Sequence, residues 1–72
     1  MTNTAALNDL IRESGLKRSY IAKCLGISTT TLSYKINNRR AFTAREIDIM
    51  CKVLGIDSLE QRFAIFFADE VE

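Results

Sequence analysis

The sequence predicts an all-α fold, a compact bundle of five short helices, and three observations predict it. Apolar residues recur at the i, i+3, i+4 spacing of helices, and no segment shows the alternation of a strand. Serine or threonine precedes several of these segments, where a hydroxyl can cap a helix, and glycine follows three of them. The 72 residues include no proline and are 47% hydrophobic and 26% charged, which is typical of one folded domain over residues 1–72.

Two helices are expected in the first part of the chain. One begins after Thr4, whose hydroxyl can cap it, and ends at Ser14 before Gly15, while the other covers about residues 18–25. Lys17 is a poor N-cap for the second helix because its side chain has no acceptor oxygen. Apolar residues at helical spacing form the buried faces of these two helices: Leu7, Leu10, Ile11, Ile21 and Leu25.

A third short helix is expected after Ser28, a good N-cap, and it ends near Asn37. Only Leu32 and Ile36 on it are clearly apolar, so most of its surface must face something polar. Its three consecutive threonines are mediocre helix formers that suit contacts with a partner, although threonine is also common in a first turn without such a role. Residues 18–37 thus have the pattern of a helix-turn-helix, whose second helix fits the major groove of B-DNA, about 12 Å wide.

The last two helices are expected after Thr43 and after Ser58. Thr43 and Glu46 have the spacing of a capping box, and the helix that follows ends at Leu54, before Gly55. Apolar residues at helical spacing lie in both helices: Ile47, Met50, Cys51 and Leu54, then Leu59, Phe63, Phe66 and Phe67.

Charge is strongly segregated along the chain, although the net charge is only +1. Residues 12–45 hold eight Lys or Arg against Glu13 alone, a net charge of +7, and the remaining residues carry −6. The basic part includes the predicted helix-turn-helix and the loop 37–42, which Phe42 is expected to anchor to the core. Uneven charge on an ordinary solvated surface is the alternative, but the coincidence with an independent motif favours a nucleic-acid partner.

The residue types present exclude most catalytic chemistry. The chain has no histidine, and Cys24 and Cys51 are its only cysteines. It therefore has no Ser–His pair, no Cys–His pair and no His-containing zinc site, and two thiols alone cannot complete a four-ligand zinc site. Both cysteines fall in helical patterns and are expected to be apolar filler, while a disulfide is possible by count but disfavoured in a cytosolic setting. There is no glycine-rich phosphate loop. We therefore expect a protein that is not an enzyme, with no cofactor, no metal and no evident small-molecule ligand.

Targeting features are not apparent in the sequence. No apolar run approaches the roughly 20 residues that cross a bilayer, and residues 1–4 lack the basic and apolar regions of a signal peptide. We expect a cytoplasmic protein without membrane contact.

Four segments carry a resemblance to a known family: Ile21–Ser28, Thr31–Ser33, the Asn-rich basic loop 37–42 and Val53–Ile56. From about residue 7 to residue 67, the chain resembles the lambda-repressor-like, Cro/cI-type helix-turn-helix domains of phage and bacterial regulators (the XRE family). The resemblance implies the five-helix bundle that the residues predict independently, and a small Cro-like repressor. One departure is Lys35, where many members carry a large apolar residue, which leaves open whether this lysine faces DNA or the core.

The resemblance also implies DNA-binding roles for two groups of residues. Members of the family read base edges at the positions of Thr29, Thr30, Ser33 and Tyr34. They bind the DNA backbone at, or close to, the positions of Arg18, Lys35, Asn38, Arg39 and Arg40. Since no base-reading residue is an Arg or Gln capable of a bidentate contact, specificity is expected to depend on thymine methyl groups and on DNA deformability.

The fifth helix raises the question of dimerisation. Its apolar residues span more of the circumference than one core-facing stripe needs: Phe63, Ile65, Phe66 and Phe67. Most of that set is expected in the core, and the segment at about 58–72 is expected to form a homodimer on DNA, with recognition helices about 34 Å apart. The expected function is a sequence-specific transcriptional regulator, a repressor on a double-stranded operator. The alternative is a helix-turn-helix protein-interaction module, such as an antitoxin or adaptor.

Overall fold

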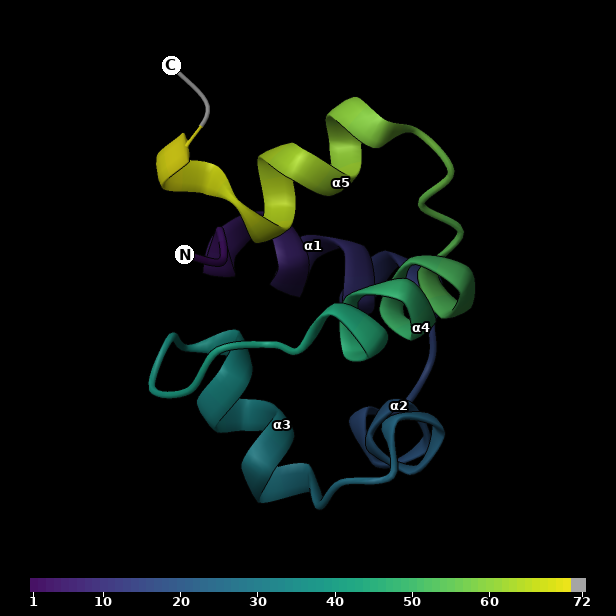
Figure 1. The fold of residues 1–72 in the computed structure, drawn as a ribbon. Coiled ribbons are helices and arrows are strands. Elements are labelled where there is room, and N and C mark those ends of the chain that lie inside the picture. The colour runs from purple at the N-terminus through teal and green to yellow at the C-terminus, as the bar shows by residue number, and fades with distance from the viewer. Residues whose placement is uncertain (71–72) are drawn as a thin grey trace.

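The chain folds into five α-helices and a 3₁₀ turn, and the computed structural model describes residues 1–70 (Figure 1). In chain order the elements are α1 (Thr4–Ser14), α2 (Arg18–Leu25), α3 (Thr29–Ile36), α4 (Ala44–Leu54), α5 (Leu59–Phe66) and η1 (Ala68–Glu70). The Cα radius of gyration is 11.1 Å, close to the roughly 11 Å expected for a folded chain of this length. Residues 1–70 therefore form the compact, all-α arrangement of five helices that the sequence predicts, and none of these helices is long and apolar enough to cross a membrane.

Most helix ends lie where capping chemistry predicts them. The hydroxyls of Ser28, Thr43 and Ser58 accept hydrogen bonds from the backbone N–H three residues later, at 3.0, 3.1 and 3.2 Å. Lys17 gives α2 no side-chain cap. Gly26 ends α2 with φ of 73°, a left-handed conformation that glycine adopts without steric cost, and this lets the chain turn directly into α3.

The N-cap of α1 differs from the prediction. Asn3, not Thr4, is the cap, and its side-chain oxygen accepts a hydrogen bond from the backbone N–H of Ala6 at 3.1 Å. The Thr4 hydroxyl instead donates to the backbone carbonyl of Ile36 at 2.7 Å. The expected cap was wrong because this hydroxyl satisfies a carbonyl at the end of α3, a tertiary contact across 32 residues.

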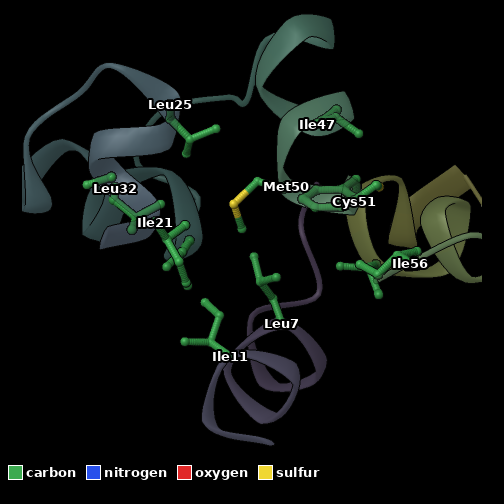
Figure 2. Close-up of a cluster of buried hydrophobic side chains, with 13 residues drawn as sticks. Leu7, Ile11, Ile21, Leu25, Leu32, Ile47, Met50, Cys51 and Ile56 are labelled. Atoms are coloured by element: carbon green, nitrogen blue, oxygen red, sulfur yellow. The ribbon is translucent and has the colours of Figure 1, made fainter. Parts of the chain in front are cut away.

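The core lies where α1, α2, α3 and α4 meet, and Figure 2 shows Met50 of α4 in the middle of its side chains. Its largest fully buried side chains come from these four helices: Leu7, Ile21, Leu32, Ile36, Met50 and Cys51. Cys51 is therefore the apolar filler that was predicted, and Cys24 is half-buried; both are free thiols. Helix α5 packs against α1, and its own buried residues are Ile65 and Phe66.

The helices form two ends of the molecule. In Figure 1, α2 and α3 occupy one end, α5 and η1 the other, and α1 and α4 lie between them. The contacts agree with this arrangement, since α2 packs on α3 and α4, while α1 contacts α3, α4 and α5. Helices α2 and α3 thus lie at the end opposite α5, whereas the loop 37–42 that follows α3 reaches the end of α5, where Phe42 packs edge to face on Phe66 with ring centroids 5.5 Å apart.

Candidate functional site

The outward face of α3 carries the four residues expected to read bases. Thr29, Thr30 and Ser33 are exposed and Tyr34 is 37% exposed. The opposite face of α3 is held by Leu32 and Ile36, which are both fully buried. Helix α3 therefore presents hydroxyl groups and one phenol to solvent.

An arginine lies beside the exposed ring at the end of α3. The guanidinium carbon of Arg39 is 5.6 Å from the centroid of the Tyr34 ring, within the range of a cation–π interaction. The backbone N–H of Arg39 also donates to the carbonyl of Tyr34 at 2.8 Å. These two contacts bring a predicted backbone-binding residue and a predicted base-reading residue together.

Local hydrogen bonds hold two more of the predicted residues. At the start of α2, a guanidinium nitrogen of Arg18 donates to the side-chain oxygen of Asn8 in α1 at 2.6 Å. Asn37, just after α3, donates through its side-chain amide to the carbonyl of Ser33 at 2.9 Å. Arg18 and Ser33 are thus restrained while remaining exposed.

Lys35 does not lie on this surface, which corrects its expected role as a DNA-backbone contact. The residue is 8% exposed, and its Nζ donates to Oε1 of Glu46 in α4 at 2.6 Å. Burial alone would raise the pKa of Glu46, but hydrogen bonds from Lys35 and from the backbone of Thr43 outweigh it and lower the pKa. The physical reason for the correction is that a buried carboxylate needs a cation, and Lys35 supplies it.

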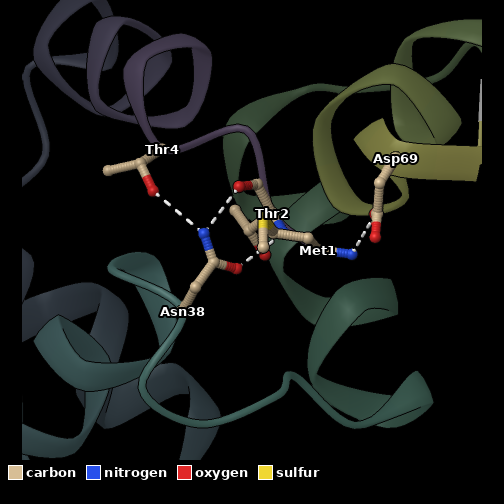
Figure 3. A network of polar contacts seen from close by, with 5 residues as sticks. All are labelled: Met1, Thr2, Thr4, Asn38 and Asp69. Carbon is tan, nitrogen blue, oxygen red and sulfur yellow. Dashed lines mark hydrogen bonds and ion pairs between the residues drawn. The ribbon is translucent and has the colours of Figure 1, made fainter.

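Asn38, expected to contact the DNA backbone, is exposed and has a structural role as well. Its backbone is left-handed, with φ of 64°, a conformation that asparagine tolerates better than most residues. Its side-chain oxygen accepts from the backbone N–H of Thr2 at 2.8 Å, and its side-chain nitrogen donates to the carbonyl of Thr2 at 2.9 Å (Figure 3). The same nitrogen lies 3.3 Å from the Thr4 hydroxyl. Through these bonds Asn38 ties the loop 37–42, which carries Arg39 and Arg40 and is called the arginine loop below, to the N-terminal segment.

Six exposed cations remain in the basic segment, residues 12–45. Of the eight Lys and Arg in residues 12–45, Arg12 pairs with Asp9 and Lys35 with Glu46. The others have no ion-pair partner among residues 1–70: Lys17, Arg18, Lys23, Arg39, Arg40 and Arg45. Residues 14–45 contain no Asp or Glu, so no acidic residue within this segment reduces the positive potential of the six cations.

Only part of the residue set proposed for dimer contacts is accessible. Ile65 and Phe66 are 3% and 4% exposed, so they belong to the core, which corrects their assignment as contact residues. Phe63 is 44% exposed and stacks on the half-buried Phe67, with ring centroids 5.2 Å apart. Leu59, one turn before Phe63, is 79% exposed. Residues 71 and 72 of the expected dimer segment lie outside the described residues.

Sequence reasoning missed three residues connected with this end of the molecule. Glu46 was assigned only to the capping box. Its ion pair with Lys35, 11 residues away, follows from no local sequence pattern. Tyr20 and Lys23 are exposed on α2, with Tyr20 at 52%. Helical spacing would have found them, because the buried stripe of α2 points away from these positions.

Comparisons of the chain with known protein families, characterised proteins and solved structures find no significant match. Function therefore has to be inferred from the geometry and charge of this surface.

Proposed function

We propose that the protein is a sequence-specific DNA-binding regulator of transcription, a Cro/cI-like repressor. In this proposal α2 and α3 act as a helix-turn-helix, and α3 enters the major groove of an operator. One observation carries it: the hydroxyl-rich outward face of α3 stands in the chain between two sets of exposed cations, Lys17, Arg18 and Lys23 before it and Arg39 and Arg40 after it, that have no ion-pair partner among residues 1–70. A polyanion with hydrogen-bonding base edges complements both properties.

Each exposed residue has a chemical role in this complex. The hydroxyls of Thr29 and Thr30 donate to or accept from base edges, and their methyl groups meet thymine methyls. Tyr34 offers a flat ring that Arg39 supports from one side. Arg18, Arg39 and Arg40 neutralise phosphates, and the positive end of the α2 dipole adds to the contribution of Arg18.

We expect two copies to bind a two-fold operator. The exposed pair Leu59 and Phe63 on α5 provides an apolar contact away from α3. Sedimentation of the protein alone and with a full operator measures this stoichiometry. A monomer under both conditions would contradict it.

A protein-interaction module is the second candidate function, and the same exposed apolar pair on α5 favours it. In that case the protein would bind DNA duplexes, if at all, without preference for any sequence. The two functions differ in the salt dependence of binding, because DNA binding releases counterions from phosphates and contact between apolar faces does not.

Selection of bound duplexes from a random library tests the proposed function. Enrichment of a two-fold motif is expected. For that motif, log K should fall linearly with the logarithm of the salt concentration, with a slope of about 0.9 per phosphate neutralised. Because each copy has six cations without an ion-pair partner among residues 1–70, the slope per copy should be no steeper than about 5. Arg39→Gln/Arg40→Gln should weaken all sequences alike and reduce the slope by up to about 2. Lys52→Gln, an exposed cation in α4 outside the basic segment, is the matched control. Absence of any enriched duplex would overturn the proposal.

A further inference from the structure

A groove of about 380 Å³ opens beside the arginine loop, between this loop and the end of α5. Its lining combines side chains from the loop, the N-terminal segment and α5: Met1, Arg39, Arg40, Phe42, Phe66 and Phe67. Neither the packing of the core nor the outward face of α3 accounts for this combination.

The floor of the groove is aromatic and fixed by packing. The rings of Phe42 and Phe66 meet edge to face, with centroids 5.5 Å apart and an interplanar angle of 86°. Phe66 is 4% exposed and Ile47 beside it is 7% exposed, so both are anchored in the core. Phe67 is half-buried, and Met1, 66% exposed, adds a flexible apolar side chain at the wall. The floor is therefore formed before any ligand arrives, which lowers the entropic cost of binding.

The loop side of the groove rim is cationic and its backbone is held in place, while on the opposite side the carboxylate of Asp69 pairs with the N-terminal ammonium of Met1 at 2.6 Å. Arg39 and Arg40 are exposed and have no ion-pair partner among residues 1–70. Their backbone N–H groups both point to the carbonyl of Tyr34, at 2.8 and 3.4 Å. The hydrogen bonds between Asn38 and Thr2 fix the loop against the N-terminal wall (Figure 3).

The aromatic floor and the cationic side of the rim together indicate which kind of ligand fits the groove. A phosphodiester satisfies the arginines but leaves the apolar floor uncovered, and a neutral apolar group does the reverse. A short extended peptide with one bulky apolar side chain between carboxylates satisfies both.

We propose that this groove is a docking site for an acidic peptide segment of a partner protein, which inserts one aromatic side chain between Phe42 and Phe67 and places its carboxylates on Arg39 and Arg40. Both arginines also contact phosphates in the proposed function, so the peptide and DNA exclude each other. This competition rests on the proposed function, whereas the peptide site does not. The partner would then release the regulator from its operator.

A fluorescein-labelled peptide, acetyl-Asp-Glu-Phe-Glu-Asp, tests the site by fluorescence anisotropy with the free protein. It should bind at least about tenfold more tightly than the same peptide with Ala in place of Phe, and than Lys-Lys-Phe-Lys-Lys. Arg40→Gln should weaken binding by about tenfold. Arg45→Gln, which removes an exposed cation outside the groove, should not. These surface changes avoid the folding defect that a change at Phe42 risks.

Several outcomes would overturn the proposal. Equal binding of the Ala peptide would show attraction by charge alone, and preference for the Lys peptide would exclude an acidic partner. Self-association that Arg40→Gln abolishes, without peptide binding, would assign the groove to a second copy of this chain. Displacement of a selected duplex by the Phe peptide is measured separately, so a failure of DNA binding leaves the peptide titration valid.

Discussion

The ammonium group of Lys35 lies 2.6 Å from Oε1 of Glu46, and both side chains are at least nine-tenths buried, at 10% and 7% exposure. The same oxygen accepts the backbone N–H of Thr43 at 2.8 Å. One carboxylate oxygen therefore completes the capping box of α4 and holds the last turn of α3. The orientation of α3 depends directly on this junction.

Removal of the Lys35 charge should destabilise the protein strongly. Lys35→Met keeps an unbranched side chain one atom shorter but leaves a buried carboxylate without its cation, and a loss of about 3 kcal/mol is expected in urea unfolding. Lys35→Met/Glu46→Gln should recover part of this loss, because Gln keeps an acceptor for Thr43 without a charge. Arg12→Met, which breaks an exposed pair with Asp9, should cost less than about 0.5 kcal/mol. Additive losses in the double variant would contradict the coupling.

Glu46 should also make stability depend on acidity. Its pKa in the folded protein lies below the ordinary value of 4.5, so the unfolded chain binds the proton more readily. Its contribution is thus fully present above about pH 4.5 and is lost as pH falls through the lower, folded pKa. The difference in unfolding free energy between wild type and Glu46→Gln should therefore become smaller as the pH is lowered from 7 to 3. A difference that stays constant over this range would exclude Glu46 as the source.

Tyr34 is expected to contribute to sequence preference. Tyr34→Ala removes the ring that lies against Arg39, and it should flatten the preference of the enriched motif at one or two positions, by about 1 kcal/mol each. Tyr34→Phe retains the ring and separates the role of the phenol from that of the ring. An unchanged motif from Tyr34→Ala in a repeated duplex selection would show that this residue reads no base.

Two variants separate the backbone and side-chain roles of Asn38. Asn38→Gly keeps the left-handed backbone and loses the bonds to Thr2, so a cost of about 1–2 kcal/mol is expected in urea unfolding. Asn38→Ala loses the same bonds and adds about 1 kcal/mol of backbone strain. Lys52→Gln changes an exposed residue of α4 outside this loop and serves as the control. Equal stability of the Gly and Ala variants would mean that the left-handed conformation imposes no strain.

Local chemistry explains how much of the fold the sequence predicts. The boundaries of α2 and α4 follow from residues within a few positions of each end, such as Thr43 with Glu46, and the structure confirms them. Asn3 replaces Thr4 as a cap because the Thr4 hydroxyl has a partner 32 residues away, which no local rule can reveal. The contacts of Asn38 with Thr2, 36 residues apart, are of the same kind.

The candidate site was predictable on the face of α3 and less so around it. Leu32 and Ile36 fix which side of α3 is buried, so the exposure of Thr29 and Thr30 follows. In α5, apolar residues surround most of the helix, and spacing alone does not decide that Phe66 is buried while Phe63 is exposed.

The burial of one amine gives this protein an internal reporter. Lys17, Lys23 and Lys52 are exposed, whereas Lys35 is covered and bonded to Glu46. An acylating reagent that modifies free amines should therefore label Lys35 only when α3 separates from α4. Its labelling rate relative to the other lysines, followed by mass spectrometry, would measure how often α3 separates from α4.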